Sequence, residues 1–246
     1  MRSFVATAAL AVCATGLIAT PASAATVVYG FAWADGKGAL RVLPRTAKPY
    51  TSQGYKLHKI TELRGAKEVR LDYTGAAYRR VTTACDLVET EGRVAVDRNG
   101  LGKTACRPAD LTTSLRRGPV LVRISYTGAK AATVHELLGG QGSQKTARGT
   151  IKRVNDTTIT FTSGGKTVKL GYSHTMGFNR VTARCGDGWL SGRPVNADRD
   201  GLGTKLCDHK AFTKVLKGVR YPTLAVVYHS PIRGEVFEVT EVYGDA

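Results

Sequence analysis

Hydrophobic and polar residues alternate along three successive segments of the C-terminal part of the chain, which predicts three β-strands. The segments span residues 149–154, 157–162 and 166–172. Turn-forming residues separate them, Asn-Asp in the first gap and Ser-Gly-Gly in the second. Short alternating runs joined by such turns are typical of an antiparallel meander.

A helix and two further strands are expected after this meander. Phe212 and Leu216 are four residues apart, so they share one helical face, and Gly218 follows as a stop signal. The segments 224–228 and 235–243 are again strand-like.

Two sequence blocks occur twice in the chain. The first block is RVTTAC at 80–85 and RVTARC at 180–185, and the second is DRNGLG at 97–102 and DRDGLG at 198–203. Other matching positions are 67–73 with 166–172, and Leu111 and Leu115 with Phe212 and Leu216. The repetition predicts a duplicated unit, divided as a leader 1–24, a first repeat 25–138, a Gly-rich linker 139–147 and a second repeat 148–246.

The expected order of elements in each repeat resembles that of the OB-type small barrel. That order is three strands, a short helix and two strands. The long cysteine-containing loop before the helix departs from the OB pattern. The resemblance implies small OB-like antiparallel barrels. Together with the repetition, it predicts a mostly β fold with two such barrels, each with one short helix and one intra-repeat disulfide.

The first 24 residues are predicted to be a secretory signal peptide. A basic start precedes an apolar run from Phe4 to Ile18, and small residues end the segment before Ala25. The alternative is a lipoprotein signal at Cys13, although Val12 is a poor residue before a lipidated cysteine. We therefore expect a secreted, extracellular protein without a membrane span.

Four cysteines remain after removal of the leader, and four cysteines allow three disulfide connectivities. Only the pairs Cys85–Cys106 and Cys185–Cys207 give both repeats the same bond. An exported chain with an even cysteine count favours disulfides over metal thiolates. Each bond closes a loop of about 20 residues, which is worth about 3 kcal/mol in the chain-entropy model.

The chain is strongly basic. Its net charge is +17, and loss of the leader leaves +16 because Arg2 is the only charged residue there. Such a balance favours acidic partners, including anionic polymers of a cell surface, although many exported proteins are simply well solvated.

The segment 26–33 is predicted to be an additional N-terminal strand of the first repeat. Tyr29, Phe31 and Trp33 alternate with smaller residues and therefore share one face. Two interpretations are open: a packed edge strand, or a free strand that docks on a partner protein through its aromatic residues.

The two Asp-Arg-Asx-Gly sequences resemble the start of a calcium-binding loop. The candidate oxygen ligands are Asp97, Asn99, Asp198 and Asp200. Position five is Leu in both loops and position twelve is Pro or His, whereas a calcium loop needs an oxygen ligand and a bidentate Glu. We therefore expect turns capped by the Asp side chain, with a weak calcium site as the alternative. Arg98 and Arg199 at these loops are candidate partner-binding residues.

No catalytic constellation is recognised in the sequence. There is no Gly-x-Ser-x-Gly motif and no paired-histidine metal motif. The only acid–base idea pairs Asp187 with His174, which are near in sequence alone. We expect no enzymatic activity and no cofactor. Nucleic acid is an unlikely partner because the aromatic residues that recur in both repeats suit a protein core.

These observations favour a non-enzymatic secreted binding protein acting through protein–protein contacts, as an adaptor, scaffold or inhibitor, with another secreted or surface protein as partner. The alternative is a cationic protein that binds polyanions at the cell surface. A calcium-stabilised module is a third hypothesis.

Overall fold

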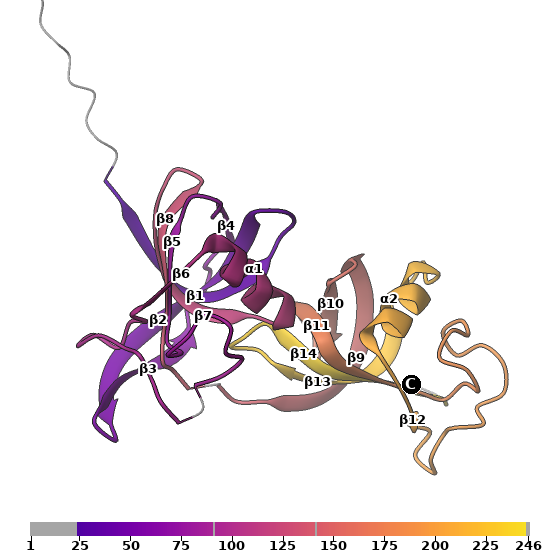
Figure 1. The fold of residues 1–246 in the computed structure, drawn as a ribbon. Coiled ribbons are helices and arrows are strands. Elements are labelled where there is room, and N and C mark those ends of the chain that lie inside the picture. The colour runs from indigo at the N-terminus through magenta and orange to yellow at the C-terminus, as the bar shows by residue number, and fades with distance from the viewer. Residues whose placement is uncertain (1–23, 91, 141, 245–246) are drawn as a thin grey trace, which may run out of the picture.

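The computed structural model describes residues 24–90, 92–140 and 142–244, which form fourteen strands and two helices in two sheets. Strands make up 53% of the described residues and helices 9%, which confirms the mostly β prediction. The two sheets lie side by side, and each has its own helix (Figure 1). The predicted leader lies outside the described residues apart from Ala24.

The first half of the described chain carries eight strands and one helix. They are β1 (Thr26–Ala34), β2 (Ala39–Ser52), β3 (Tyr55–Glu62), β4 (Val69–Asp72), β5 (Ala77–Arg80), β6 (Thr104–Cys106), α1 (Pro108–Arg117), β7 (Val120–Thr127) and β8 (Lys130–Glu136).

The second half of the described chain carries six strands and one helix. They are β9 (Lys145–Asn155), β10 (Thr158–Ser163), β11 (Lys166–Arg180), β12 (Lys205–Cys207), α2 (His209–Lys217), β13 (Thr223–Ser230) and β14 (Glu235–Glu241). The predicted meander, helix and two closing strands of this half are all present.

The second sheet closes into a five-stranded barrel. Its order is β10-β9-β13-β14-β11, and β11 pairs back with β10, while β12 adds to the edge of β11. The pairing of β11 with β14 is parallel, so the prediction of a wholly antiparallel barrel is wrong at this pair. The parallel pair arises because α2 and β13 lie between these strands in the chain and return β14 in the direction of β11.

The first sheet has the order β3-β2-β1-β7-β8-β5-β6, and β4 pairs with both β2 and β8. The pairing of β5 with β8 is parallel, like that of β11 with β14. The segment between β4 and β5 leaves the ladder around Thr74, where the Asp72 carboxylate accepts hydrogen bonds from the Thr74 amide and hydroxyl at 2.8 and 2.7 Å.

Strand β1 is one of the inner strands of the first sheet, whereas the sequence predicts an additional strand at its edge. It pairs with β2 on one side and β7 on the other, as β9 pairs with β10 and β13. Gly30 and Gly149 occupy corresponding places in β1 and β9. A Cβ at either position would come within 2.1 or 2.2 Å of a carbonyl oxygen of the neighbouring strand. Glycine is therefore required where the backbone of the neighbouring strand approaches so closely.

Among the described residues, the second half has no strand in the place of β3. Strand β2 continues beyond its pairing with β1 and forms a hairpin with β3, hereafter the arm, residues 45–62. Gln53 and Gly54 have positive φ angles of 50° and 78°, which suit a two-residue turn between twisted strands. The arm projects from the body of the first half (Figure 1).

Each half has its own hydrophobic core. Leu111 and Leu115 of α1 enter the first core, and Phe212 and Leu216 of α2 enter the second, as their spacing predicted. The carboxylate of Asp208 accepts a hydrogen bond from the Ala211 amide at 2.9 Å and so caps the start of α2.

The predicted linker 139–147 is shorter than expected. Lys145 and Ala147 belong to β9, where they pair with His229 and Val227 of β13. Gly139 forms a bridge with His58. None of the helices in the described ranges is long and apolar enough to cross a membrane.

The two halves are joined through a tightly packed contact. Trp33 of β1 lies against Gly171 of β11, where a Cβ would come within 2.7 Å of the indole ring, and its Nε1 donates to the Arg233 carbonyl oxygen at 3.2 Å. The Arg45 guanidinium donates to the carbonyl oxygens of Ile232 and Pro231 at 2.7 and 2.9 Å. Burial lowers the pKa of Arg45, and the three hydrogen bonds it donates to carbonyl oxygens satisfy the buried donors.

A carboxylate also bridges the two halves. Glu68 accepts from Arg41 of β2 at 2.6 Å and from Lys169 of β11 at 2.5 Å. The Arg41 guanidinium lies 5.3 Å from the ring centroid of Trp33. Indole packing, buried hydrogen bonds and an ion-pair bridge therefore hold the two sheets in one fixed arrangement.

Candidate binding surface

Both cysteine loops are anchored by a buried arginine and a buried glutamate. In the second half, Arg180 donates to Glu241 at 2.7 Å, and both side chains are fully buried. The guanidinium also donates to four carbonyl oxygens of the loop that follows. These belong to Arg184, Cys185, Asp187 and Gly188, at 3.2, 2.9, 2.7 and 2.8 Å. The Arg180 side chain therefore fixes the loop backbone.

The first half contains the same arrangement. Arg80 donates to Glu136 at 3.1 Å, and to the carbonyl oxygens of Cys85 and Leu87 at 2.7 Å. The second oxygen of Glu136 accepts from the Val81 amide at 2.9 Å. Tyr78 donates to Glu136, and its pKa is strongly raised by burial and by that carboxylate. Both Glu136 oxygens are engaged in hydrogen bonds that hold the fold together.

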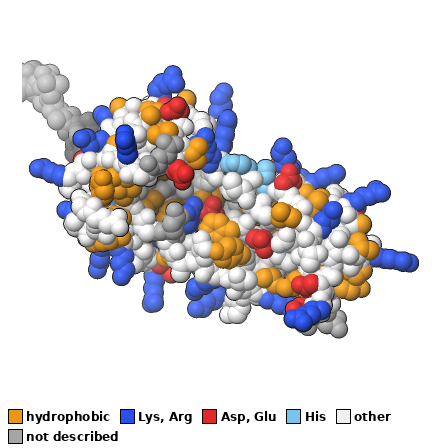
Figure 2. Space-filling model, turned by 60° about the horizontal axis from the view of Figure 1, so that its bottom comes forward, with side chains coloured by type: hydrophobic (Ala, Val, Ile, Leu, Met, Phe, Trp, Pro, Cys, Tyr) orange, Lys and Arg blue, Asp and Glu red, His pale blue; other side chains and the backbone are white. Residues whose placement is uncertain are grey.

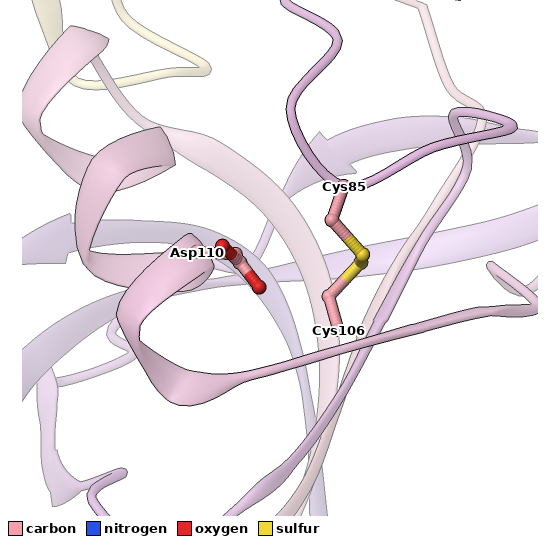
Figure 3. A group of neighbouring side chains, drawn as sticks. All are labelled: Cys85, Cys106 and Asp110. Atoms are coloured by element: carbon pink, nitrogen blue, oxygen red, sulfur yellow. A yellow bond between two sulfur atoms is a disulfide. The ribbon is translucent and has the colours of Figure 1, made fainter.

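The predicted disulfides Cys85–Cys106 and Cys185–Cys207 are confirmed. Cys85, Cys106 and Asp110 form the one cluster of possible metal-ligating side chains in the described ranges. Figure 3 shows that the two sulfurs are joined to each other and that Asp110 lies nearby on α1. Asp110 accepts from the Arg107 amide at 2.8 Å, so it caps the helix start. With both sulfurs in a disulfide, this cluster has no thiolate to offer a metal.

The four candidate calcium ligands lie in two turns that the first aspartate of each holds together. Asp97 accepts from the amides of Asn99 and Leu101 at 2.8 and 2.9 Å. Asp198 accepts in the same way from Asp200 and Leu202, at 2.9 and 2.8 Å. This is the predicted Asx-type turn. The neighbouring Arg98 and Arg199 are exposed, and Arg199 borders an open hollow beside Arg148 and Tyr243.

The aromatic residues of β1 do not form a free docking strand. Strand β7 pairs with β1 from Thr26 to Ala32 and β2 pairs with it from Gly30 to Ala34, so the stretch around Phe31 is paired on both edges and cannot add to a partner's sheet. Phe31 and Trp33 are buried, and Trp33 faces the second half. Tyr29 is half-buried and accepts from Arg123 at 3.3 Å. The prediction that these three side chains bind a partner is wrong for Phe31 and Trp33, which are part of the contact within the chain.

The acid–base idea gains no support from the contacts of its two members. His174 faces the Arg116 carbonyl oxygen at 3.1 Å, and Asp187 accepts from the Arg184 amide at 2.9 Å.

The aromatic residues that recur in both halves are buried in the two hydrophobic cores. They are Tyr73, Tyr172, Tyr78 and Phe178.

A cleft of about 510 Å³ lies between the first cysteine loop, α1, the end of β8 and Arg233 of the second half. Val88, Leu121 and Leu138 supply apolar lining, and Arg80 and Glu136 lie among the residues that border it. The hydrogen bonds of this arginine and glutamate are used within the fold. The cleft also has polar lining, which includes Glu89, Ser114 and Arg117, so its surface is mixed.

The arm presents a different kind of surface. Directly opposite residues in an antiparallel pair share one face. The inward face carries His58 and Ile60, which are buried against the body. The outward face carries four cross-strand pairs. They are Thr46–Thr61, Lys48–Lys59, Tyr50–Leu57 and Ser52–Tyr55.

The outward face is accessible along most of its length. Tyr50 and Tyr55 are each 43% exposed, and Lys48 and Lys59 are exposed. Neither lysine has an ion-pair or hydrogen-bond partner for its ammonium group among the described residues. The one acid of the arm, Glu62, pairs with Arg45 and therefore belongs to the inward face.

The inward face fixes the arm. The amide of His58 donates to the Leu138 carbonyl oxygen at 2.8 Å, and its imidazole faces the same oxygen at 3.3 Å. A Cβ at Gly100 would come within 2.3 Å of the Lys56 carbonyl oxygen, so the Asp97 turn also packs on β3. Burial lowers the pKa of His58, which keeps the imidazole neutral at physiological pH.

Positive charge is spread over the molecule. Lys and Arg side chains project around the outline of the face in Figure 2, and Asp and Glu are few and scattered there. No protein-family model matches this chain, and no curated protein or solved structure shows significant similarity to it.

The sequence contains a signal for the arm that the strand predictions do not include. His58 and Ile60 alternate with Leu57, Lys59 and Thr61, which is the period of a strand with one buried face. The sequence also contains a signal for the two buried ion pairs, because their arginines, Arg80 and Arg180, begin the two copies of the first repeated block.

Proposed function

We propose that this chain is a secreted, non-enzymatic binding protein that holds another protein through the outward face of its arm. The observation that carries the proposal is the exposure of Tyr50 and Tyr55 on a hairpin whose opposite face is anchored to the body. Tyrosine is enriched at protein interfaces because it combines a large apolar ring with a hydroxyl. A preformed hairpin also loses little conformational entropy on binding.

Secretion is supported by the chemistry of the cysteines. All four cysteines outside the predicted leader are paired in disulfides, and disulfides persist in oxidising compartments. The leader of residues 1–24 supplies the matching export signal in this proposal.

We further infer that the two halves are copies of one OB-type unit. Supporting this are the shared order of strand pairings, the corresponding Gly30 and Gly149, and an Arg–Glu pair beside each cysteine loop. The arm is then an addition to the first copy. A feature present in one copy alone is the natural place for a specific function, since the shared features maintain the fold.

The contact between the halves suits an adaptor or scaffold. Trp33, Arg45 and Glu68 tie the two sheets together, so a partner held by the arm has a defined orientation relative to the second half. The fixed geometry leaves the second half, with its exposed Tyr221 and Leu206, available for a different contact.

Affinity capture from the culture fluid of the producing cells tests the proposal. Immobilised wild-type protein is compared with Y50S/Y55S, and with Y221S/Y243S as a control that removes two exposed tyrosines from the second half. We expect a discrete protein that the wild type and the control retain and that Y50S/Y55S loses. Retention of polyanions alone, lost with salt and unaffected by either tyrosine pair, would instead favour the polyanion-binding alternative.

A further inference from the structure

We infer that the protein segment held by the arm is acidic, with a carboxylate received between Lys48 and Lys59 and an apolar side chain beside it on Tyr50 and Leu57. The inference rests on the proposed function and names the chemistry of its partner. It is carried by the pairing of two like charges on an exposed face.

Lys48 and Lys59 lie directly opposite each other across β2 and β3. Like charges at directly opposite positions destabilise a strand pair. In a stabilising cross-strand ion pair, one of the two opposite residues is an acid. Here both are lysines, and none of the described residues forms an ion pair with either of them. The unfavourable pair thus creates a local site for an anion, because one carboxylate placed between two ammonium groups relieves their repulsion.

The neighbouring rows define what surrounds that anion. On one side, the hydroxyls of Thr46 and Thr61 are hydrogen-bonded to each other. On the other side lies the Tyr50–Leu57 pair, with Tyr55 in the row beyond. In an extended segment, an acidic residue would therefore meet the lysines while an apolar residue two positions along packs on the tyrosine and leucine.

This arrangement favours an acidic protein segment over an anionic polymer. A phosphate polymer would use the two lysines but gain nothing from the adjacent aliphatic and aromatic row. It would also bind the exposed lysines of the second half, such as Lys152 and Lys166, equally well.

Binding of defined probes to the full mature protein tests the inference by fluorescence anisotropy. The probes are a peptide of repeated Glu-Ser-Leu-Ser, which places Glu and Leu on the same face of an extended chain, its Gln-for-Glu counterpart, and inorganic polyphosphate. The variants are K48Q/K59Q and a matched control, K152Q/K166Q, which removes the same charge from the second half. We expect the acidic peptide to bind the wild type and the control alike, and K48Q/K59Q to bind it roughly tenfold more weakly.

Three results would overturn the inference. One is equal binding of the acidic peptide by K48Q/K59Q and wild type, and another is equal binding of the Gln peptide by the wild type. The third is polyphosphate binding that both double variants weaken equally, with no binding of the acidic peptide. If the protein captured from the culture fluid contacts the arm through a segment without acidic residues, this inference fails while the proposed function stands. If no protein is captured at all, the proposed function itself fails.

Discussion

Trp33 of the first half lies against Gly171 of the second so closely that a Cβ at residue 171 would come within 2.7 Å of its indole ring. The glycine is needed for this approach, and it lies just before the register shift in the pairing of β11 with β14. Gly177, on the same strand, is different, because its Cβ would meet the nearest atom at 3.5 Å, an ordinary van der Waals contact.

Gly171→Ala should therefore displace the indole and destabilise the protein by about 1–3 kcal/mol. Measured in a W189F background, where Trp33 is the one remaining tryptophan, the fluorescence emission should shift to the red as the ring becomes hydrated. Gly177→Ala is the control and should change neither quantity. An unshifted emission in Gly171→Ala would show that the contact between the halves is not packed as described.

The Arg180–Glu241 pair should be the costliest polar interaction to break. Arg180→Met leaves Glu241 buried without its cation, and such a change typically costs about 3–5 kcal/mol. Arg184→Met removes an exposed arginine from the same loop and should be nearly neutral. Urea denaturation of both variants gives the comparison. A loss of less than about 1 kcal/mol in Arg180→Met would contradict the assigned role of the buried pair.

Stability should fall as the pH drops below neutrality. Burial lowers the pKa of His58, His135 and His229 from the usual 6.5, so the folded state favours their neutral forms. Since the unfolded chain then binds more protons, their contribution is fully present above pH 6.5 and is lost as the pH falls toward the lowered values. Glu235 acts in the opposite sense, because burial raises its pKa from 4.5 and favours its protonated form in the folded state.

The free energy of unfolding measured between about pH 7.5 and 5.5 checks this prediction, because the histidines dominate in that window. His229→Gln should reduce the slope, as it removes one of the three titrating groups. A flat profile across the window in the wild type would be inconsistent with lowered pKa values of these three imidazoles.

Lys59→Glu should make the protein more stable and its binding weaker. The substitution replaces a like-charge cross-strand pair by an opposite-charge pair with Lys48, worth about 0.5 kcal/mol. The same change repels an acidic partner. Lys152→Glu, opposite Thr160 in the second sheet, is the control and should leave binding unchanged. A variant that loses stability, or gains stability without losing partner binding, would argue against a binding role for the lysine pair.

The sequence predicted local features well and the relations between distant segments poorly. The disulfides followed from the duplicated cysteine spacing, and the strands around Ile159 and Leu170 followed from period-two alternation joined by short turns. The inner position of β1 did not follow, because its partner strand β7 lies more than ninety residues away, as in the pairing of Val28 with Ile124. Alternation defines a buried face but does not state which strands lie on either side.

The candidate surface was misplaced for the same reason. Phe31 and Trp33 are both buried, Trp33 against Gly171 and Phe31 beside Arg233, and only the tertiary arrangement reveals these contacts with the second half. No local sequence feature distinguishes Tyr50 and Tyr55 from residues of the core. Their exposure depends on how far β2 and β3 extend beyond the sheet.

Site-specific photo-crosslinking tests the central claim most directly. A benzophenone amino acid is placed at residue 55 on the arm, and in a control at residue 221, where the native tyrosine is 67% exposed on the second half. Each protein is irradiated in the culture fluid of the producing cells. The account predicts a discrete protein adduct from residue 55 that is absent from residue 221 and reduced in K48Q/K59Q. Adducts of equal yield from both positions, or none from residue 55, would contradict it.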